Sequence, residues 1–531
     1  MATASSPAPL RLAELVAALS LATDLGTGQP MEHALRVCLL AVSLGDELGV
    51  DEAERRDVYY IALLRAIGCV SDAHRVAARF GDEILANAQI SLLDTAQPAD
   101  ALGLILRDVG AGQPALRRAR MILAALAAGP NERNQVITAH CEVAEHLAQH
   151  LGMWPEVALG ITQVYERWDG KGSPGRLRGE AIVRPARIVI LARDAELFFR
   201  LGGIEGATHV IRQRSGTLYD PVLAERLCQR APDLFAVLDT DAVWDAALDV
   251  EPGPHLVLAP ARRETALRAI ADFVDLKSPY TAGHSSGVAL LAAAAAEHLG
   301  LGETDVAAVR QAGYLHDLGR VGISSAIWDK PGPLNESERE RVRLHPYYTD
   351  RVLARSEALA RLAAIAALHH ERLDGSGYYR GIPAAMLSMP ARLLAAADAY
   401  HAMTERRPYR PAHTPAAAAA HLRAEAHAGR LDAGAVSAVL AAAGHPVRTA
   451  RRAWPADLSD REVEVLRLLA RGFSNREMAS HLCIAEKTVG HHVQHIYNKI
   501  TVSTRAAATL FALQHGLLDD RDVLPNGVSS E

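Results

Sequence analysis

Several residue classes are scarce in this chain of 531 residues, and each scarcity excludes a class of protein. The five cysteines are scattered and form no Cys-x-x-Cys pair, which argues against a disulfide framework or a zinc ribbon. No apolar run approaches the roughly 18 residues that span a bilayer, and the N-terminus lacks the pattern of a signal peptide. We therefore expect a soluble protein of the reducing cytoplasm with no membrane partner.

Basic charge and strand-forming residues are also scarce. Lys plus Arg number 56 against 62 for Asp plus Glu, so the net charge is −6 and a general basic coat for nucleic acid is excluded. Aromatic residues make up only 5% of the chain. Nearly every segment shows helical periodicity interrupted by Gly, Pro or Asp, and Ala, the best helix former, dominates many segments. The sequence therefore predicts an all-α fold.

Two segments rich in Pro divide the chain into three predicted domains, as expected for a chain too long for a single core. The segment 251–262 contains Glu-Pro-Gly-Pro, and the segment 445–456 contains His-Pro and Trp-Pro. We interpret both segments as linkers. The predicted domains are a first helical domain at 1–250, a second at 263–444 and a short C-terminal domain at 457–520, followed by a tail at 521–531.

The two longer domains are predicted to be copies of one unit, which we call the first copy (1–250) and the second copy (263–444). Residues 166–170 read Glu-Arg-Trp-Asp-Gly, and residues 371–375 read Glu-Arg-Leu-Asp-Gly. The separation between matching residues is the same in both copies on each side of a 46-residue insertion in the first copy. The matching pairs, first copy before second, are His33 and His284, Arg65 and His316, His140 and His345, and Asp169 and Asp374.

Histidines and aspartates are concentrated in the second copy, in or beside predicted helices. They are His284, His316, Asp317, His345, His369, His370 and Asp398. Three of them occupy helical positions where an apolar core residue is expected. Buried carboxylates are costly without partners, and a shared metal removes that cost. Seven ligands exceed the need of one ion but suit two first-row divalent ions about 3.5–4 Å apart, with Asp317 as the natural bridge.

The motifs around these residues resemble the HD superfamily of metal-dependent phosphohydrolases, and within it the HD-GYP branch of cyclic-di-GMP phosphodiesterases. The similarity extends from about residue 263 to residue 443. The matching motifs are Tyr-Thr-Ala-Gly-His (280–284), His-Asp-Leu-Gly-Arg (316–320), Lys-Pro-Gly (330–332), His-His-Glu-Arg-Leu-Asp-Gly-Ser-Gly-Tyr (369–378), Leu-x-x-x-Ala-Asp-Ala-Tyr (393–400) and Arg-Pro-Tyr-Arg (407–410).

The resemblance implies a role for each of these residues. One metal ion would be held by His284, His316, Asp317 and Asp398, and the other by Asp317, His345, His369 and His370. Fe or Mn are the expected metals, with Zn, Co and Ni as further candidates. Arg320 and Lys330 would face the phosphates of the substrate and act with Asp317 in catalysis. The remaining substrate contacts are expected from Arg372, Asp374, Gly377 and Tyr378.

Three departures from the family pattern bear on function. The Gly-Tyr-Pro tripeptide reads Gly377-Tyr378-Tyr379, and the Lys expected after His-Asp-x-Gly is Arg320, which does not deprotonate. Tyr280 stands where some members have a Glu ligand for a third ion, so we predict two ions. Three functions stay open: a phosphodiesterase for cyclic-di-GMP or a related nucleotide, a domain that binds metal or nucleotide without turnover, and a phosphohydrolase of other nucleotides.

The first copy lacks most of the ligands. Its corresponding residues are His33, Arg65, Ala66, His140, Val164, Tyr165 and Asp194. The bridging carboxylate has become Ala66, and the paired histidines have become Val164 and Tyr165, so a two-metal site is not expected there. The first copy is either a structural half that packs on the second copy and dimerises, or a ligand sensor that has exchanged catalysis for recognition.

The C-terminal domain has clear helix boundaries. Capping-box patterns at 459–462 and 474–477 predict the starts of two helices. A turn at 483–485 leads to a longer helix at 486–499, and Ser503 is expected to cap a fourth helix. A short helix, a tight turn and a longer helix are typical of helix-turn-helix DNA readers.

These residues resemble the LuxR-type helix-turn-helix, through the segments 458–466, 472–479, 487–489 and 496–500. The resemblance implies that the helix 486–499 enters the major groove of DNA. Base edges would be contacted by Lys487, His491 and Gln494. Phosphates would be contacted by Thr488, His492 and Lys499. The fourth helix would pair two subunits, giving a homodimer on a two-fold operator.

The alternative for this domain is a helical interaction module that does not touch DNA. From residue 455 to residue 520, Lys plus Arg number 7 and Asp plus Glu number 8, so modest intrinsic affinity with a shallow salt dependence is expected. Together, the domains predict a transcriptional regulator that carries a metal-dependent phosphodiesterase. Whether the nucleotide changes DNA binding is a separate question, since joined domains need not communicate.

Overall fold

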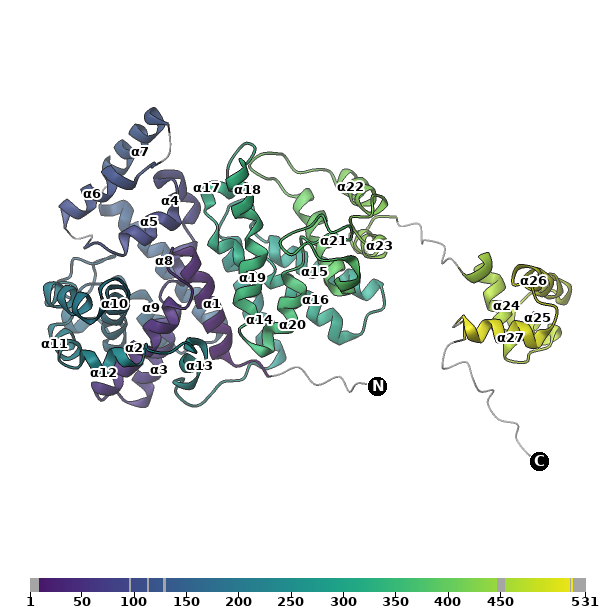
Figure 1. Ribbon diagram of the computed structural model, residues 1–531, viewed down its shortest axis with the longest axis horizontal. Coiled ribbons are helices and arrows are strands. Elements are labelled where there is room, and N and C mark those ends of the chain that lie inside the picture. Colours follow the sequence, from purple (N-terminus) through teal and green to yellow (C-terminus); the bar gives the residue numbers. More distant parts are fainter. Residues whose placement is uncertain are drawn as a thin grey trace. The chain divides into compact units, whose positions relative to one another are not determined.

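The computed structural model describes residues 9–94, 97–111, 114–127, 130–446, 454–515 and 517–518. In these residues the regular structure is helical, with isolated β-bridges and no strand, which confirms the all-α prediction. The chain forms two compact units, residues 1–447 and 448–531 (Figure 1). None of the described helices combines the length and the hydrophobicity needed to cross a membrane.

The first unit contains both predicted copies. The helices up to residue 250 are α1 (Leu12–Gly26), α2 (His33–Glu47), α3 (Glu52–Leu64), η1 (Ile67–Val70), α4 (Ala73–Phe80), α5 (Glu83–Ile90), α6 (Pro98–Asp108), α7 (Ala115–Ala127), α8 (Pro130–Leu151), α9 (Pro155–Thr162), η2 (Gly179–Ala181), α10 (Arg184–Arg214), α11 (Pro221–Gln229), α12 (Ala231–Ala236) and α13 (Val243–Asp249). The following helices are α14 (Pro260–Asp275), α15 (His284–His298), α16 (Glu303–Leu315), η3 (Leu318–Gly322), α17 (Ser325–Trp328), α18 (Glu336–Arg343), α19 (His345–Leu353), α20 (Glu357–Ala366), η4 (Ala384–Met386), α21 (Met389–Thr404), α22 (Pro415–His427) and α23 (Ala433–Ala442).

Equivalent backbone contacts recur in the two copies. Asp24 accepts a hydrogen bond from the backbone N of Ala34 at 3.0 Å, and Asp275, 251 positions later, accepts one from Ser285 at 2.9 Å. This recurrence supports the predicted repeat.

The contact between η1 and α8 also has its counterpart between η3 and α19. A Cβ added to Gly68 would lie 2.1 Å from the carbonyl oxygen of His140, and one added to Gly319 would lie 2.0 Å from that of His345. Glycine is therefore required at both crossings, and it brings two equivalent histidines to equivalent places.

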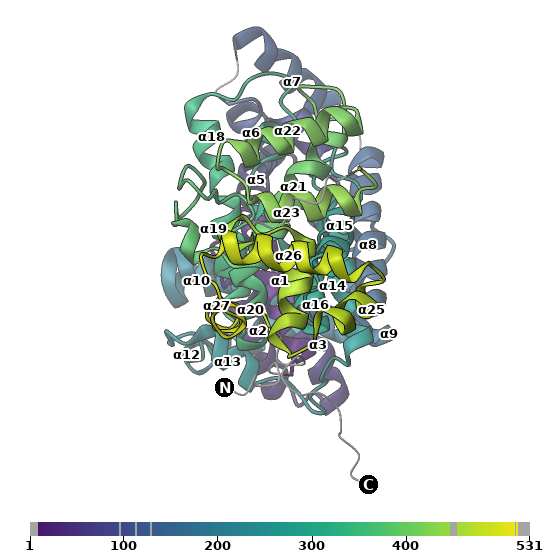
Figure 2. The same cartoon turned by 90° about the vertical axis from the view of Figure 1, so that its right-hand side faces the viewer.

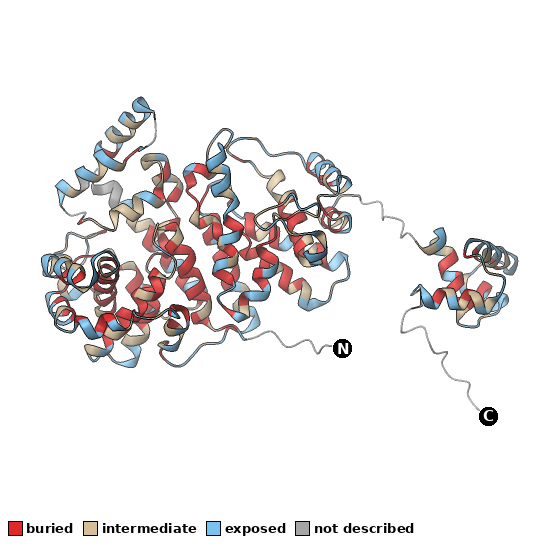
Figure 3. Ribbon diagram, viewed as in Figure 1, coloured by how far each residue is buried: buried red, intermediate tan, exposed pale blue. Residues whose placement is uncertain are grey.

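The two copies share one hydrophobic core, because the first helix of each copy contacts helices of both copies. Helix α1 packs against η3 and α19 of the second copy, and α14 packs against α8 of the first copy. The buried residues of both copies form a single cluster. Figure 3 shows buried residues along α1, α14 and α19, whereas α6 and α7 are mostly exposed or half-buried.

The segment predicted as the first linker packs against the start of the chain. Leu12 N donates to Leu256 O at 2.8 Å, and Leu258 N donates to Leu10 O at 2.9 Å. Glu251 is buried and accepts a hydrogen bond from the hydroxyl of Tyr60 at 2.8 Å. Most of the second predicted linker, 445–456, and all of the predicted tail, 521–531, lie outside the described residues.

One carboxylate of the insertion is buried between the copies. Glu83, the first residue of α5, accepts hydrogen bonds from Lys277 Nζ at 2.7 Å, from Ser324 Oγ at 2.7 Å and from the backbone N of Ser325 at 2.8 Å. The side chains of Glu83 and Lys277 are both 2% exposed. The insertion of the first copy is thus fastened to the second copy where α17 begins.

The C-terminal unit contains η5 (Pro455–Asp457), α24 (Asp460–Ala470), α25 (Asn475–Leu482), α26 (Glu486–Lys499) and α27 (Arg505–Gln514). Figure 2 labels α25, α26 and α27. Both predicted capping boxes are present, with Ser459 and Ser474 as the N-caps. The predicted cap at Ser503 is wrong, because the hydroxyl of Thr504 accepts the hydrogen bond from Ala507 N at 3.3 Å.

We expect Glu83→Ala to lower the free energy of unfolding of the full chain by about 3–5 kcal/mol, because Lys277 would stay buried without its counter-charge. Glu297→Ala is the matched control, since Glu297 is an exposed carboxylate on α15. Denaturant unfolding followed by circular dichroism measures both variants. Equal effects of the two substitutions would contradict the assignment of Glu83 as an anchor between the copies.

Candidate metal centre and nucleic-acid interface

All seven residues predicted as metal ligands converge inside the second copy. His284 is the first residue of α15, His316 and Asp317 follow α16, His345 is the first residue of α19, His369 and His370 follow α20, and Asp398 lies within α21. Six of the seven are buried, and His370 is half-buried. Five separate segments of chain thus place imidazoles and carboxylates around one point.

Asp317 lies between two groups of imidazoles. Its Oδ1 atom is 3.5 Å from His345 Nε2 and 3.6 Å from His369 Nε2. Its Oδ2 atom is 3.5 Å from His316 Nε2 and 3.8 Å from His284 Nε2. Each carboxylate oxygen therefore faces a different pair of nitrogen atoms, which is the arrangement of a bridging ligand.

Asp398 completes the group that includes His284. Its Oδ1 atom is 3.2 Å from His284 Nε2 and 3.9 Å from His316 Nε2, and its Oδ2 atom is 3.9 Å from His370 Nδ1. In one group, His284, His316 and Asp398, the potential ligand atoms lie within 4.8 Å of one another, and the same holds in the group of His345, His369 and His370. A further group, His316, Asp317 and His369, combines residues of both predicted ligand sets, so the division of the ligands between two ions stays a prediction.

Three histidines are oriented by backbone carbonyls. His316 Nδ1 donates to Gly313 O at 2.8 Å, His345 Nδ1 to Val342 O at 2.6 Å and His369 Nδ1 to Ala366 O at 2.7 Å. With the proton on Nδ1, each Nε2 presents a lone pair to the centre, as metal-binding histidines do. His316 Nε2 is buried and has no hydrogen-bond partner.

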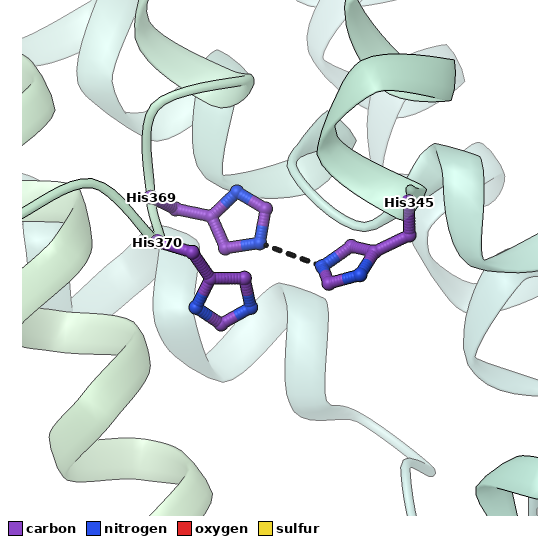
Figure 4. A group of neighbouring side chains, drawn as sticks. All are labelled: His345, His369 and His370. Carbon is purple, nitrogen blue, oxygen red and sulfur yellow. Dashed lines mark hydrogen bonds between the residues drawn. The ribbon is translucent and has the colours of Figure 1, made fainter. Parts of the chain in front are cut away.

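Two of these lone pairs face each other. His345 Nε2 and His369 Nε2 are 3.1 Å apart, the contact marked in Figure 4. Burial lowers the pKa of His345 to about 4 and that of His369 to about 3, so neither ring readily takes up a second proton. Two opposed acceptors repel unless a cation binds both, and first-row metals bind imidazole nitrogen at about 2.1 Å. The donor set therefore fits a metal ion.

His284 is oriented by Glu405, which was not among the predicted site residues. Its Nδ1 atom lies 2.9 Å from Glu405 Oε2, to which it donates, and Arg407 also donates to Glu405 at 2.8 Å. Burial lowers the pKa of His284, but Asp398 and Glu405 outweigh it and raise this pKa to about 9. A cation bound at Nε2 would displace a proton from this ring. In the sequence, the feature that could have pointed to Glu405 is its position seven residues after the predicted ligand Asp398.

Arg320 contacts Asp317 and lies against Trp328, a residue that was not among the predicted site residues. Arg320 Nη1 donates to Asp317 Oδ2 at 2.9 Å, and the guanidinium carbon lies 3.9 Å from the centre of the Trp328 ring. The Trp328 ring also meets the His345 ring edge-on at 5.5 Å. Burial raises the pKa of Asp317, but the neighbouring histidines and Arg320 outweigh it and hold this pKa well below its usual value.

The predicted substrate residues lie in different surroundings. Tyr378 stacks on His370 at 4.7 Å, and Gly377 lies so close to the backbone of Arg372 that an added Cβ would be 2.4 Å from its N. Asp374 is exposed and accepts hydrogen bonds from Ser376. Lys330 donates to Glu338 at 2.6 Å. Tyr378 thus borders the metal centre directly, and the contacts of Lys330, Arg372 and Asp374 with a substrate stay predictions.

The motif retained in both copies holds a loop together. Glu371 is buried and accepts hydrogen bonds from the backbone N of Arg380 at 2.7 Å and of Gly381 at 3.2 Å. Glu166 in the first copy accepts one from Arg176 N at 3.0 Å. Because this role needs no metal, it explains why the motif persists in a copy that has lost the ligands.

The first copy does not gather a comparable set of ligands. The groups of three or more potential metal ligands found among the described residues all lie in the second copy. His33 Nδ1 lies 2.5 Å from Glu196 Oε2, and Asp194 accepts hydrogen bonds from Arg193 and from Tyr219, both at 2.6 Å. The carboxylates near these positions are thus occupied by protein donors.

In the C-terminal unit, α26 presents the predicted base-contacting residues to solvent. Lys487, His491 and Gln494 are exposed, whereas Val489 and Ile496 are buried in the domain core. Thr488 is exposed and His492 is half-buried. Lys499 donates to Glu462 at 2.8 Å and so fastens α26 to α24. The first three residues occupy the free face of α26, and the contact of Lys499 with a phosphate stays a prediction.

Opposed imidazoles and a carboxylate shared between two ligand groups define the centre of an HD-type, metal-dependent phosphohydrolase. Comparison with known proteins agrees. The HD domain family matches residues 120–223 and 268–434. The family described as bacterial regulatory proteins, luxR family, matches residues 456–512.

Individual relatives support the same assignment. A 3'3'-cGAMP-specific phosphodiesterase 3 of Vibrio cholerae is 34% identical over 405 residues, which are 76% of this chain and 88% of the relative. A crystal structure of a cyclic GMP-AMP specific phosphodiesterase of V. cholerae has a TM-score of 0.57 at 30% identity and covers 82% of this chain and 98% of that one. A cyclic di-GMP phosphodiesterase response regulator of Xanthomonas campestris is 35% identical over 39% of this chain and 56% of its own length. The chain belongs to the HD-domain phosphohydrolases and carries a C-terminal domain of the LuxR family.

Adding Mn²⁺ to chelator-treated protein is expected to stabilise it, because a ligand that binds only the folded state adds about 2.7 kcal/mol at a hundredfold excess over its dissociation constant. Asp317→Asn should lose most of this stabilisation, since one bridging oxygen is replaced by an amide. Asp305→Asn, at an exposed aspartate paired with Arg361, is the control. Thermal unfolding with and without Mn²⁺ measures the gain, and an unchanged gain in Asp317→Asn would refute the bridging arrangement.

Proposed function

We propose that the second copy hydrolyses a 3'3'-linked cyclic dinucleotide, with 3'3'-cGAMP as the first candidate and cyclic-di-GMP as the second. The observation that carries the proposal is the pair of opposed Nε2 atoms of His345 and His369 beside the shared carboxylate of Asp317. The choice of substrate rests on the names of relatives that span most of the chain.

Two divalent ions, Fe or Mn by preference, would be held by the predicted ligands. The first ion would bind His284, His316, Asp317 and Asp398, and the second would bind Asp317, His345, His369 and His370. When bound, such a pair lowers the pKa of a water molecule and neutralises phosphoryl charge for an in-line displacement. Glu405 keeps His284 in the tautomer that presents Nε2 to the centre, because it accepts the Nδ1 proton.

The protein groups around the ions would bind and orient the substrate. Arg320 is held by Trp328 at the edge of the centre, and its guanidinium can donate to a phosphate oxygen as well as to Asp317. Tyr378, stacked on His370, offers a ring face beside the ligands on which a base can stack. Lys330 would approach the phosphates after release from Glu338.

Metal-loaded wild-type protein is expected to convert 3'3'-cGAMP to a linear dinucleotide, which chromatography detects. Asp317→Ala should reduce the rate by about a thousandfold or more, because loss of the metal pair removes several kcal/mol of transition-state stabilisation. Asp305→Ala should retain activity. Parallel reactions with cyclic-di-GMP and with non-cyclic nucleotides identify the substrate. Equal product yields from the wild type and from Asp317→Ala would sink the proposal.

We further propose that α26 binds the major groove of DNA and that two chains pair through α27. Support for the first part comes from the exposed Lys487, His491 and Gln494 on the face opposite the buried stripe. Support for pairing comes from Leu510 and Leu513, which are 54% and 56% exposed on α27. Such a dimer would recognise a two-fold operator in the cytoplasm and make the chain a transcriptional regulator.

Lys487→Ala and Gln494→Ala are each expected to weaken binding to a selected operator by about 1–3 kcal/mol, the usual cost of losing a base contact. Glu464→Ala, on the exposed face of α24, is the control. Mobility-shift titrations at a fixed salt concentration measure the dissociation constants. Unchanged affinity in both variants would mean that α26 is not the recognition helix.

A further inference from the structure

A guanidinium in the first copy has two buried nitrogen atoms without a hydrogen-bond partner. Arg65 follows the last residue of α3, and its Nε and Nη2 atoms are buried without a hydrogen-bond partner. Within the described part of the chain, Arg65 forms no ion pair. A charge removed from water without compensation costs several kcal/mol, so such a group is expected to have a partner.

Neighbouring groups do not supply that partner. Asp24 is fully buried; burial raises its pKa to about 7, although Arg65 opposes the rise, so this carboxyl is a weak anion near neutral pH. Burial lowers the pKa of Arg65; Asp24 opposes this shift, and the nearby charge of Arg193 adds to it. Asp194, which could have served, is already paired with Arg193 at 2.6 Å.

His140 is a second buried polar side chain near Arg65, since both interact with Cys69. It is 8% exposed, and neither ring nitrogen has a hydrogen bond of good geometry. Cys69 lies near it, with its sulfur 3.0 Å from the hydroxyl of Tyr165. Burial raises the pKa of Cys69, but His140, Tyr165 and Arg65 outweigh it and lower this pKa, while Cys69 raises that of His140. Cys69 also opposes the lowering of the pKa of Arg65, but its hydrogen bond goes to Tyr165 and not to the guanidinium.

These residues stand where the second copy has its metal centre. Arg65 takes the position of His316, and His140 takes that of His345. In the second copy, bound cations would provide the positive charge that attracts a phosphodiester. In the first copy, the same position carries a guanidinium, which binds phosphate oxygens with paired N–H donors but does not activate water.

We propose that the first copy binds a phosphoryl anion, either free phosphate or the phosphodiester of a nucleotide, through Arg65 and His140 and does not hydrolyse it. Cys69 and Tyr165 are half-buried and the side chain of Arg193 is 30% exposed, so this cluster borders the surface. The site goes beyond the proposed phosphodiesterase activity and does not depend on it, because it uses no residue of the second copy.

The test uses the full chain treated with chelator, so that the second copy carries no cations. Inorganic phosphate and 3'3'-cGAMP are titrated separately by isothermal calorimetry into the wild type, Arg65→Met and Arg212→Met. Arg212 is an exposed arginine of α10 and controls for net charge. We expect Arg65→Met to weaken binding roughly tenfold or more, as loss of a charge-assisted hydrogen bond predicts, and Arg212→Met to leave it unchanged. The probe that binds more tightly identifies the source of the phosphoryl group.

Thermal unfolding provides an independent readout. In phosphate-free buffer, Arg65→Met should melt at the wild-type temperature or above it, because the substitution removes an unpaired buried charge. Phosphate should raise the melting temperature of the wild type and not that of Arg65→Met. Absence of any Arg65-dependent binding or stabilisation would overturn the proposal, as would a strongly destabilised Arg65→Met. Hydrolysis of 3'3'-cGAMP by metal-loaded Arg65→Met is measured in parallel. It shows whether the proposed phosphodiesterase activity holds independently of the anion site in the first copy.

Discussion

Repulsion between inward-facing lone pairs is the constraint around which the second copy is built. Backbone carbonyls take the Nδ1 protons of His316, His345 and His369 and so aim three Nε2 atoms at one point. Neutral, buried imidazoles in this arrangement favour a cation over a proton. The carboxylates of Asp317 and Asp398 would offset the charge of such a cation.

The second copy packs directly against the first copy. Helices α1 and α14 each pack against helices of both copies, and the buried residues of the two copies form one core. Glu83 fastens the insertion to Lys277 and to the start of α17. Helix α17 ends with Trp328, which contacts Arg320 and His345. A continuous series of packed groups therefore joins the insertion of the first copy to the metal centre of the second.

Divergence of the two copies has changed charge more than shape. The glycine crossings at Gly68 and Gly319 are equivalent, and Glu166 and Glu371 share one equivalent backbone hydrogen bond, from Arg176 N and from Gly381 N. What differs is the source of positive charge, which is a guanidinium in one copy and a metal-binding group in the other. A scaffold of this kind keeps affinity for phosphate while the chemistry is lost, because electrostatic attraction needs only charge and hydrolysis also needs an activated water.

The all-α class, the repeat and the helices of the C-terminal domain follow from the sequence alone, because Ala-rich helical periodicity and capping boxes are local signals. The cap at Thr504 was missed, since Ser503 and Thr504 are equivalent as caps until the backbone angles are known. The ligand candidates were also visible, because polar residues stood at core positions of predicted helices. Their roles as ligands stay predictions.

Only the tertiary structure decided which side chains orient those ligands. Trp328 and Glu83 are ordinary residues in the sequence, and nothing in their spacing marks them, whereas the only signal of Glu405 was its distance of seven residues from Asp398. Their importance arises from contacts between segments as far as 242 positions apart, as for Glu83 and Ser325. The same holds for Arg65, whose nitrogen atoms without a hydrogen-bond partner became visible once folding had buried them. Whether a charge is paired depends on distances in the folded chain, and the order of residues in the sequence does not give these distances.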